Sequence, residues 1–242
     1  MRIWAHRGCS LRYPENTLSA FRAAAEIPGL AGIETDVQMA KDGELIVLHD
    51  EKVDRTTNGT GWVKDFTLSE IQALSVDVKD GGAPEHIPTL EEVLDVLAPY
   101  MKNGLKLNIE LKNSKVQYPG MEARAIATVG SYGVLRQTVW SSFYAKSLSI
   151  VRSFLPDAEI GILDIKASDC LYKMKGGCGA DVIHPYAKAM DVTAAEVSGL
   201  TVRGWLTEKL YPAEKTEEAL DLEALEKSGV TDVFMNEPER FL

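Results

Sequence analysis

The chain contains few cysteines and no long apolar run. Its three cysteines, Cys9, Cys170 and Cys178, are an odd number and match neither a disulfide framework nor a zinc-binding pattern. We therefore expect a reducing compartment. The N-terminal residues lack the pattern of a secretory signal, and the sequence lacks the apolar stretch of a membrane anchor. These absences together predict a cytoplasmic protein without stable membrane insertion.

Basic residues are also scarce, because 26 lysines and arginines stand against 36 aspartates and glutamates, for a formal net charge of −10. A surface of this sign repels a phosphate backbone, so we expect no nucleic acid partner. Any anionic substrate must then be bound by a local cluster of positive charge. The hydrophobic content of 45% and the charged content of 26% are those of an ordinary folded chain.

Short apolar, β-branched runs alternate with helical patterns along almost the whole sequence, which predicts parallel βα units. The expected strands of the repeat cover residues 2–6, 31–38, 105–111, 136–141, 158–163, 181–184, 201–206 and 231–235. Eight such units favour an α/β fold of the TIM (β/α)8 barrel type, and a single barrel commonly has about 250 residues. We therefore expect residues 1–242 to form one domain.

The segment Glu44–His49 is expected to be an additional strand, because it follows the second strand after only a short turn. A parallel crossover needs about a dozen residues or more, so this segment must return as an antiparallel β-hairpin. The hairpin brings His49 roughly opposite Thr35 and Asp36. The polar, glycine-containing stretch of about 51–87 then interrupts the repeat, and we interpret it as a small insertion after the second strand.

Acidic side chains recur at the carboxyl ends of the expected strands. Residues two apart in a strand face the same side, so Glu34 and Asp36 project together, and Glu110 ends the next barrel strand. Parallel barrel strands bring these ends to one rim. Three close carboxylates repel one another unless a proton or a cation lies between them, and oxygen ligands favour Mg²⁺ or Ca²⁺ over zinc. The sequence therefore predicts a site for one divalent cation.

Two histidines and two cationic side chains are expected at the same rim. His6 and Arg7 end the first strand, Lys112 shares a face with Glu110, and the hairpin adds His49. The two cations suit a phosphate group, and histidines with an ordinary pKa of about 6.5 can transfer protons at neutral pH. Phosphodiester cleavage needs one group that activates the nucleophile and another that protonates the leaving alkoxide.

Four other features have more ordinary interpretations. His86 and His184 each stand alone in the sequence, so we expect them to be structural. Trp205, near the end of the seventh strand, either lines the pocket or fills a layer of the barrel. The segment Pro14–Thr17 is interpreted mainly as the start of a helix.

A set of motifs runs in order along the chain: His6-Arg7-Gly8, Pro14-Glu15-Asn16-Thr17, Glu34-Thr35-Asp36, His49-Asp50, Asp54-Arg55-Thr56-Thr57 and Ile109-Glu110-Leu111-Lys112. This ordered set resembles the glycerophosphodiester phosphodiesterase family, and the resemblance covers essentially the whole chain. It implies a TIM-barrel catalytic domain with a small insertion after the second strand. It also implies hydrolysis of a small-molecule glycerophosphodiester to glycerol 3-phosphate and an alcohol.

The resemblance further implies a role for each rim residue. The implied ligands of one Mg²⁺ or Ca²⁺ ion are Glu34, Asp36 and Glu110. The implied general acid and base are His6 and His49. The implied phosphate contacts are Arg7 and Lys112, with Trp205 as a further candidate for substrate binding.

Two other functions remain as alternatives. The same barrel could act on lysophospholipids, which would need an apolar surface near the rim, or it could be a non-catalytic module that binds a phosphorylated polyol. The presence of two histidines with three acids argues against the binding module. The stretches Trp205-Leu206-Thr207-Glu208 and Asn236-Glu237-Pro238 differ from the family pattern. We expect these differences to affect substrate identity more than the reaction.

Overall fold

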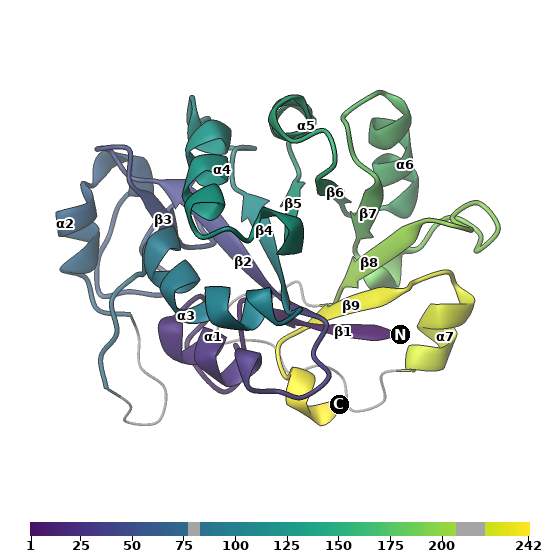
Figure 1. Cartoon of the computed structure of the whole chain (residues 1–242), viewed down its shortest axis with the longest axis horizontal. Helices are drawn as coiled ribbons and strands as arrows, with labels where there is room; N and C mark the ends of the chain where they lie inside the picture. Colours follow the sequence, from purple (N-terminus) through teal and green to yellow (C-terminus); the bar gives the residue numbers. More distant parts are fainter. Residues whose placement is uncertain (77–82, 207–220) are drawn as a thin grey trace.

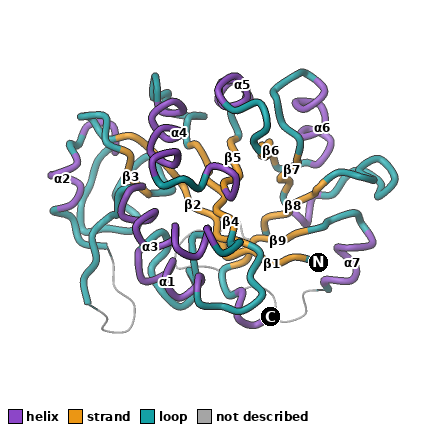
Figure 2. The backbone as a smooth tube through the Cα atoms, in the orientation of Figure 1, coloured by secondary structure: helices purple, strands orange, loops and turns teal. Residues whose placement is uncertain are grey.

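The structure is a computed structural model that describes residues 1–76, 83–206 and 221–242. Within these residues, parallel strands form one sheet in the order β1-β9-β8-β7-β6-β5-β4-β2, and pairing between β1 and β2 closes the sheet into a ring of eight. Helices lie outside this ring of strands (Figures 1 and 2). The fold is therefore the TIM barrel that the sequence predicts.

The strand boundaries lie within two residues of those predicted. The barrel strands are β1 (Arg2–His6), β2 (Gly32–Met39), β4 (Lys106–Leu111), β5 (Thr138–Ser142), β6 (Glu159–Asp164), β7 (Val182–Pro185), β8 (Thr201–Trp205) and β9 (Asp232–Met235). The α-helices are α1 (Leu18–Ala25), α2 (Leu68–Gln72), α3 (Leu90–Lys102), α4 (Met121–Ser131), α5 (Ala145–Phe154), α6 (Ala167–Lys175) and α7 (Leu222–Lys227). The 3₁₀ turns are η1 (Val63–Asp65), η2 (Leu135–Gln137), η3 (Ala187–Ala189) and η4 (Pro238–Arg240). No helix among the described residues is both long enough and apolar enough to span a bilayer.

The predicted hairpin is confirmed. β3 (Leu45–Val47) pairs antiparallel with β2, with Val47 opposite Val37. The pairing continues beyond the strand, because the Leu48 amide donates to the Asp36 carbonyl at 3.1 Å. One further step along this register places His49 opposite Thr35 of β2, as predicted.

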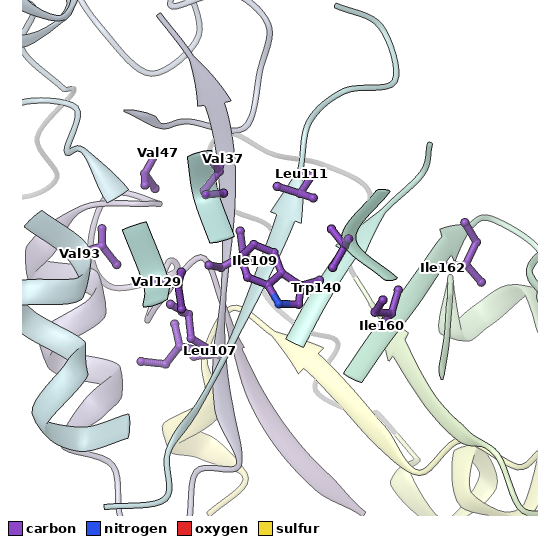
Figure 3. Close-up of a cluster of buried hydrophobic side chains, with 14 of the residues drawn as sticks. Val37, Val47, Val93, Leu107, Ile109, Leu111, Val129, Trp140, Ile160 and Ile162 are labelled. Atoms are coloured by element: carbon purple, nitrogen blue, oxygen red, sulfur yellow. The ribbon is translucent and has the colours of Figure 1, made fainter. Parts of the chain in front are cut away.

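The main hydrophobic core lies between the barrel strands and the surrounding helices. Figure 3 shows this layer, in which apolar side chains from several strands meet those of the helices. Its strand side includes Leu107, Ile109 and Leu111, and its helix side includes Val93 of α3 and Val129 of α4. Full burial of an aliphatic side chain of this size contributes about 1.5–3 kcal/mol, so this layer holds the barrel strands in register.

A second, smaller core belongs to the stretch 51–87, of which residues 77–82 lie outside the described part of the chain. Val53, Val63 and Ile71 are buried there against Ile46 of the hairpin. The stretch therefore packs on β3 and fixes the segment that carries His49 to the side of the barrel.

The lower interior of the barrel is filled by a charged network around Arg203, which is fully buried. Its guanidinium donates to Glu159 at 2.9 Å, lies 3.6 Å from Asp232 and stacks 4.1 Å above the ring of Trp4. It also lies 3.1 Å from His184 Nε2. Arginine can only donate, so His184 Nε2 accepts and its proton is on Nδ1. This layer lies inside the barrel below the rim.

The tight packing of His184 against β6 leads to a stability prediction. A Cβ atom at Gly161 would lie 2.5 Å from His184 Cε1 and Nε2. We therefore expect Gly161→Ala to lower the free energy of unfolding by about 1–3 kcal/mol in urea denaturation, through overpacking. The matched control is Gly130→Ala in α4, where the nearest atom would be 3.6 Å away and alanine is the better helix former. A Gly161→Ala protein as stable as the control would contradict this packing.

Candidate active site

The three predicted acidic residues meet at the rim because of the strand register. His6 pairs with Glu34 across β1 and β2, and Asp36 pairs with Glu110 across β2 and β4. One ligand oxygen from each carboxylate lies within 4.8 Å of the other two, and all three residues are buried. The expectation that these acids converge is therefore met in the structure.

The acids do not ionise alike. Burial raises the pKa of Glu34 well above its ordinary value, and the charge of Asp36 adds to this effect. Burial also raises the pKa of Glu110, against the opposing charge of Lys112. Burial alone would raise the pKa of Asp36 too, but His49, Arg7 and Lys112 together hold it below its ordinary value. The two glutamates therefore need additional positive charge before the whole cluster can ionise.

This donor set fits a divalent cation. It consists of carboxylate oxygens, which are the ligands that Mg²⁺ and Ca²⁺ prefer. Asp36 Oδ1 is buried and has no hydrogen-bond partner among the described residues, although Lys112 Nζ lies 3.6 Å away. A buried carboxylate oxygen without a hydrogen bond is costly, and a bound cation would satisfy it.

Arg7 is held against the acids by an unusual backbone conformation. Its φ of 57° lies in the left-handed region, and its amide donates to Glu34 Oε2 at 3.1 Å. Its guanidinium donates to Glu15 at 2.8 Å and lies 3.3 Å from Asp36 Oδ2. The next residue must be Gly8, since a Cβ there would lie 2.6 Å from the backbone of Ala20. The left-handed backbone conformation of Arg7 costs about 1–3 kcal/mol and persists only where the surroundings enforce it.

Lys112 is the second buried cation of the site. Its Nζ donates to Glu110 Oε1 at 2.9 Å. Both Arg7 and Lys112 therefore partly neutralise the acidic cluster.

His6 is oriented by Asn236. His6 Nδ1 lies 2.8 Å from Asn236 Oδ1, and an amide oxygen only accepts, so Nδ1 carries the proton. Nε2 keeps its lone pair and lies 4.0 Å from Glu34 Oε2. Burial and the charge of Arg7 lower the pKa of His6 to about 4. His6 is therefore a neutral base at pH 7.

His49 is oriented by a carboxylate instead. Its Nδ1 donates to Asp50 Oδ1 at 2.7 Å, which again leaves Nε2 as the acceptor. Burial, followed by the charges of Arg7 and Lys112, lowers the pKa of His49 well below its ordinary value. Both rim histidines can therefore accept a proton at Nε2.

The rim encloses a cavity of about 190 Å³. Of the predicted site residues, His6, Arg7, Glu34, His49, Glu110 and Trp205 line it. Asp36 and Lys112 are also buried, but they do not line the cavity. The apolar part of its lining consists of Phe143, Leu163, Trp205 and Phe234, and its polar remainder includes Asn108, Ser141 and His184. Trp205 therefore lines the cavity, with its ring packed 4.6 Å from that of Tyr186.

Sequence reasoning missed several residues that contact the site. Asn16, also in the left-handed region, donates to Asp36 Oδ2 at 2.9 Å, and Glu15 accepts from Arg7. The segment Pro14–Thr17 does start a helix, because Thr17 caps α1. The same segment also contacts the acids, and its place among the ordered motifs was the only signal of this.

Asn236 lies in a stretch that we expect to affect the substrate more than the reaction. The structure adds a contact that the sequence did not predict, because Asn236 Oδ1 accepts from His6 Nδ1. Residues Thr207 and Glu208 of the other divergent stretch lie outside the described part of the chain.

Comparison with known proteins agrees with this geometry. A glycerophosphodiester phosphodiesterase of Caldanaerobacter subterraneus is 39% identical over 242 residues, which is 99% of this chain and 96% of that protein. One of Bacillus subtilis is 35% identical and covers 98% of this chain and 84% of its own length.

Solved structures show the same fold. A glycerophosphodiester phosphodiesterase of Agrobacterium tumefaciens superposes with a TM-score of 0.79 at 26% identity, over 100% of this chain and 98% of that chain. A phosphodiesterase of Oleispira antarctica, solved with its product sn-glycerol-3-phosphate, superposes with a TM-score of 0.80 at 24% identity, over 99% of this chain and 94% of its own.

The match to a family extends over nearly the whole sequence. The sequence model of the glycerophosphoryl diester phosphodiesterase family matches residues 6–240. The barrel and the relatives above agree with that match. The chain therefore belongs to the glycerophosphoryl diester phosphodiesterase family and is an enzyme of that family.

Proposed function

We propose that this enzyme hydrolyses small glycerophosphodiesters to glycerol 3-phosphate and an alcohol, with one divalent cation, Mg²⁺ or Ca²⁺. The main support is the group of buried carboxylates whose ligand atoms lie within 4.8 Å of one another. The relatives named glycerophosphodiester phosphodiesterase support the substrate class. We also propose that residues 1–242 act as one TIM-barrel catalytic domain that carries an insertion at about 51–87.

The cation would be held by Glu34, Asp36 and Glu110. When bound, it supplies positive charge that stabilises the phosphoryl oxygens as negative charge develops on them. With the acids so compensated, Arg7 has positive charge to offer to the substrate, and Lys112, which is buried against Glu110, adds to the positive potential of the site. Arg7 already lines the cavity, where its planar guanidinium suits a phosphate oxygen pair.

The two histidines would move the protons. Each presents an Nε2 lone pair, because Asn236 and Asp50 hold the proton on Nδ1. An incoming phosphodiester anion favours the imidazolium form of a nearby histidine. One ring can then take the proton of the attacking oxygen, while the other delivers a proton to the leaving alkoxide.

The cavity lining favours a second candidate substrate class. Phe143, Leu163, Trp205 and Phe234 supply the apolar surface that a lysophospholipid would need. A panel of glycerophosphocholine, glycerophosphoethanolamine and lysophosphatidylcholine distinguishes small glycerophosphodiesters from lysophospholipids as the preferred substrate class. We expect kcat/KM to be highest for the small diesters, because a cavity of about 190 Å³ accommodates them more readily than an acyl chain. A clear preference for the lysolipid would support the second candidate instead.

Removal of the cation should abolish activity. We expect chelation to stop hydrolysis of glycerophosphocholine, and Mg²⁺ or Ca²⁺ to restore it. Glu34→Gln should weaken cation binding in isothermal titration calorimetry and lower kcat by at least 10²-fold, about 2.7 kcal/mol in the barrier. Glu44→Gln removes a carboxylate of the hairpin that pairs with Arg124 outside the site, and it should change neither quantity. A folded Glu34→Gln protein with normal cation affinity and turnover would refute the ligand assignment.

A change of leaving group can show which of the two histidines is the general acid and which is the general base. His6→Ala and His49→Ala should each lower kcat for glycerophosphocholine by about 10²–10⁴-fold. A nitrophenolate leaves without protonation, so a nitrophenyl diester should restore most of the lost rate in one variant, the one that lacks the general acid. If neither variant or both variants recover with the nitrophenyl diester, the division into one acid and one base is wrong.

A further inference from the structure

Arg55, in the insertion, is not among the proposed catalytic or binding residues, yet it binds two carboxylates beside the site. Its Nε donates to Asp50 Oδ2 at 2.7 Å, and its Nη2 lies 3.0 Å from Asp50 Oδ1. Its Nη1 and Nη2 donate to the two oxygens of Glu15, both at 2.8 Å. One guanidinium thus joins two acids from different segments of the chain.

Each of these acids holds a residue to which the proposed function gives a role. Asp50 accepts from His49 Nδ1 at 2.7 Å, and Glu15 accepts from Arg7 Nη1 at 2.8 Å. The contacts therefore form a continuous hydrogen-bond network from His49 to Arg7, with Arg55 at its centre. This network joins the end of the hairpin, the insertion and the loop between β1 and α1.

The geometry requires an arginine at the centre. The guanidinium offers five donors in a fixed plane, and here three of its nitrogen atoms make four contacts. A lysine ammonium has one nitrogen and could not hold both carboxylates in the same plane. The turn that carries Arg55 is itself fixed, because Val53 is buried and the Thr57 hydroxyl donates to the Val53 carbonyl at 2.7 Å.

We infer that Arg55 is a positioning residue that aligns His49, through Asp50, with the phosphate-binding Arg7, through Glu15. The inference rests on the proposed roles of His49 and Arg7. It gives the insertion a function, because the insertion supplies Arg55, the central residue of this hydrogen-bond network. An ion pair that only stabilised the fold would have no energetic coupling to His49.

A double-mutant cycle with Mg²⁺-loaded enzyme tests this coupling. Arg55→Met should lower kcat for glycerophosphocholine by about 10–100-fold, and Arg55→Lys should lose less. In the His49→Ala background, Arg55→Met should cause a smaller loss than in the parent, because one of the two residues that it aligns is already gone. Arg124→Met breaks the ion pair with Glu44 at the other end of the hairpin and should leave kcat unchanged.

A second measurement does not depend on turnover. The chain has four histidines, so their ring nitrogens can be resolved by ¹⁵N NMR. His49 should be a single Nδ1–H tautomer in the parent protein, and Arg55→Met should produce a mixture. Where Arg55→Met does not fold, Arg55→Lys and Asp50→Asn provide the same two readouts.

Two results would overturn the inference. One is a loss in the double variant equal to the product of the two single losses, and the other is an unchanged His49 tautomer in Arg55→Met. A parent protein that cleaves no phosphodiester but shows the tautomer change would instead contradict the proposed function and leave the alignment by Arg55 supported.

Discussion

The site depends on the crowding of negative charge at the carboxyl ends of β1, β2 and β4. The strand register alone brings Glu34, Asp36 and Glu110 together in a buried place. Mutual repulsion and burial oppose their ionisation, so the surrounding structure must supply compensation. Arg7 and Lys112 supply part of it, and the remaining deficit is what makes the place suitable for a divalent cation.

The same charges determine the state of the histidines. Burial and the charge of Arg7 lower the pKa of both His6 and His49, and Lys112 adds to the effect on His49. Their hydrogen-bond partners then decide which ring nitrogen carries the proton. The partners differ, since His6 has an amide and His49 has a carboxylate that can stabilise an imidazolium. The acids, cations and histidines therefore form one electrostatic unit rather than three separate sets.

The sequence predicts most of this arrangement but not all of it. The barrel and its rim residues follow from strand periodicity and from the rule that parallel strands end on one side, both of which are local patterns. Glu15, Asn16 and Arg55 escape such reasoning because they lie in irregular loops, where side-chain direction depends on the backbone. The left-handed conformations at Arg7 and Asn16 turn these loops toward the acids, and no periodicity encodes them. Asn236 was assigned to substrate choice because only its position beyond a strand was visible, not its contact with His6.

The buried layer around Arg203 has a consequence for how a ligand reaches the cavity. Among the described residues, Trp4, Arg203 and Asp232 are buried in the barrel interior beneath the cavity. Within the described residues, a ligand of the cavity would therefore reach it from the rim.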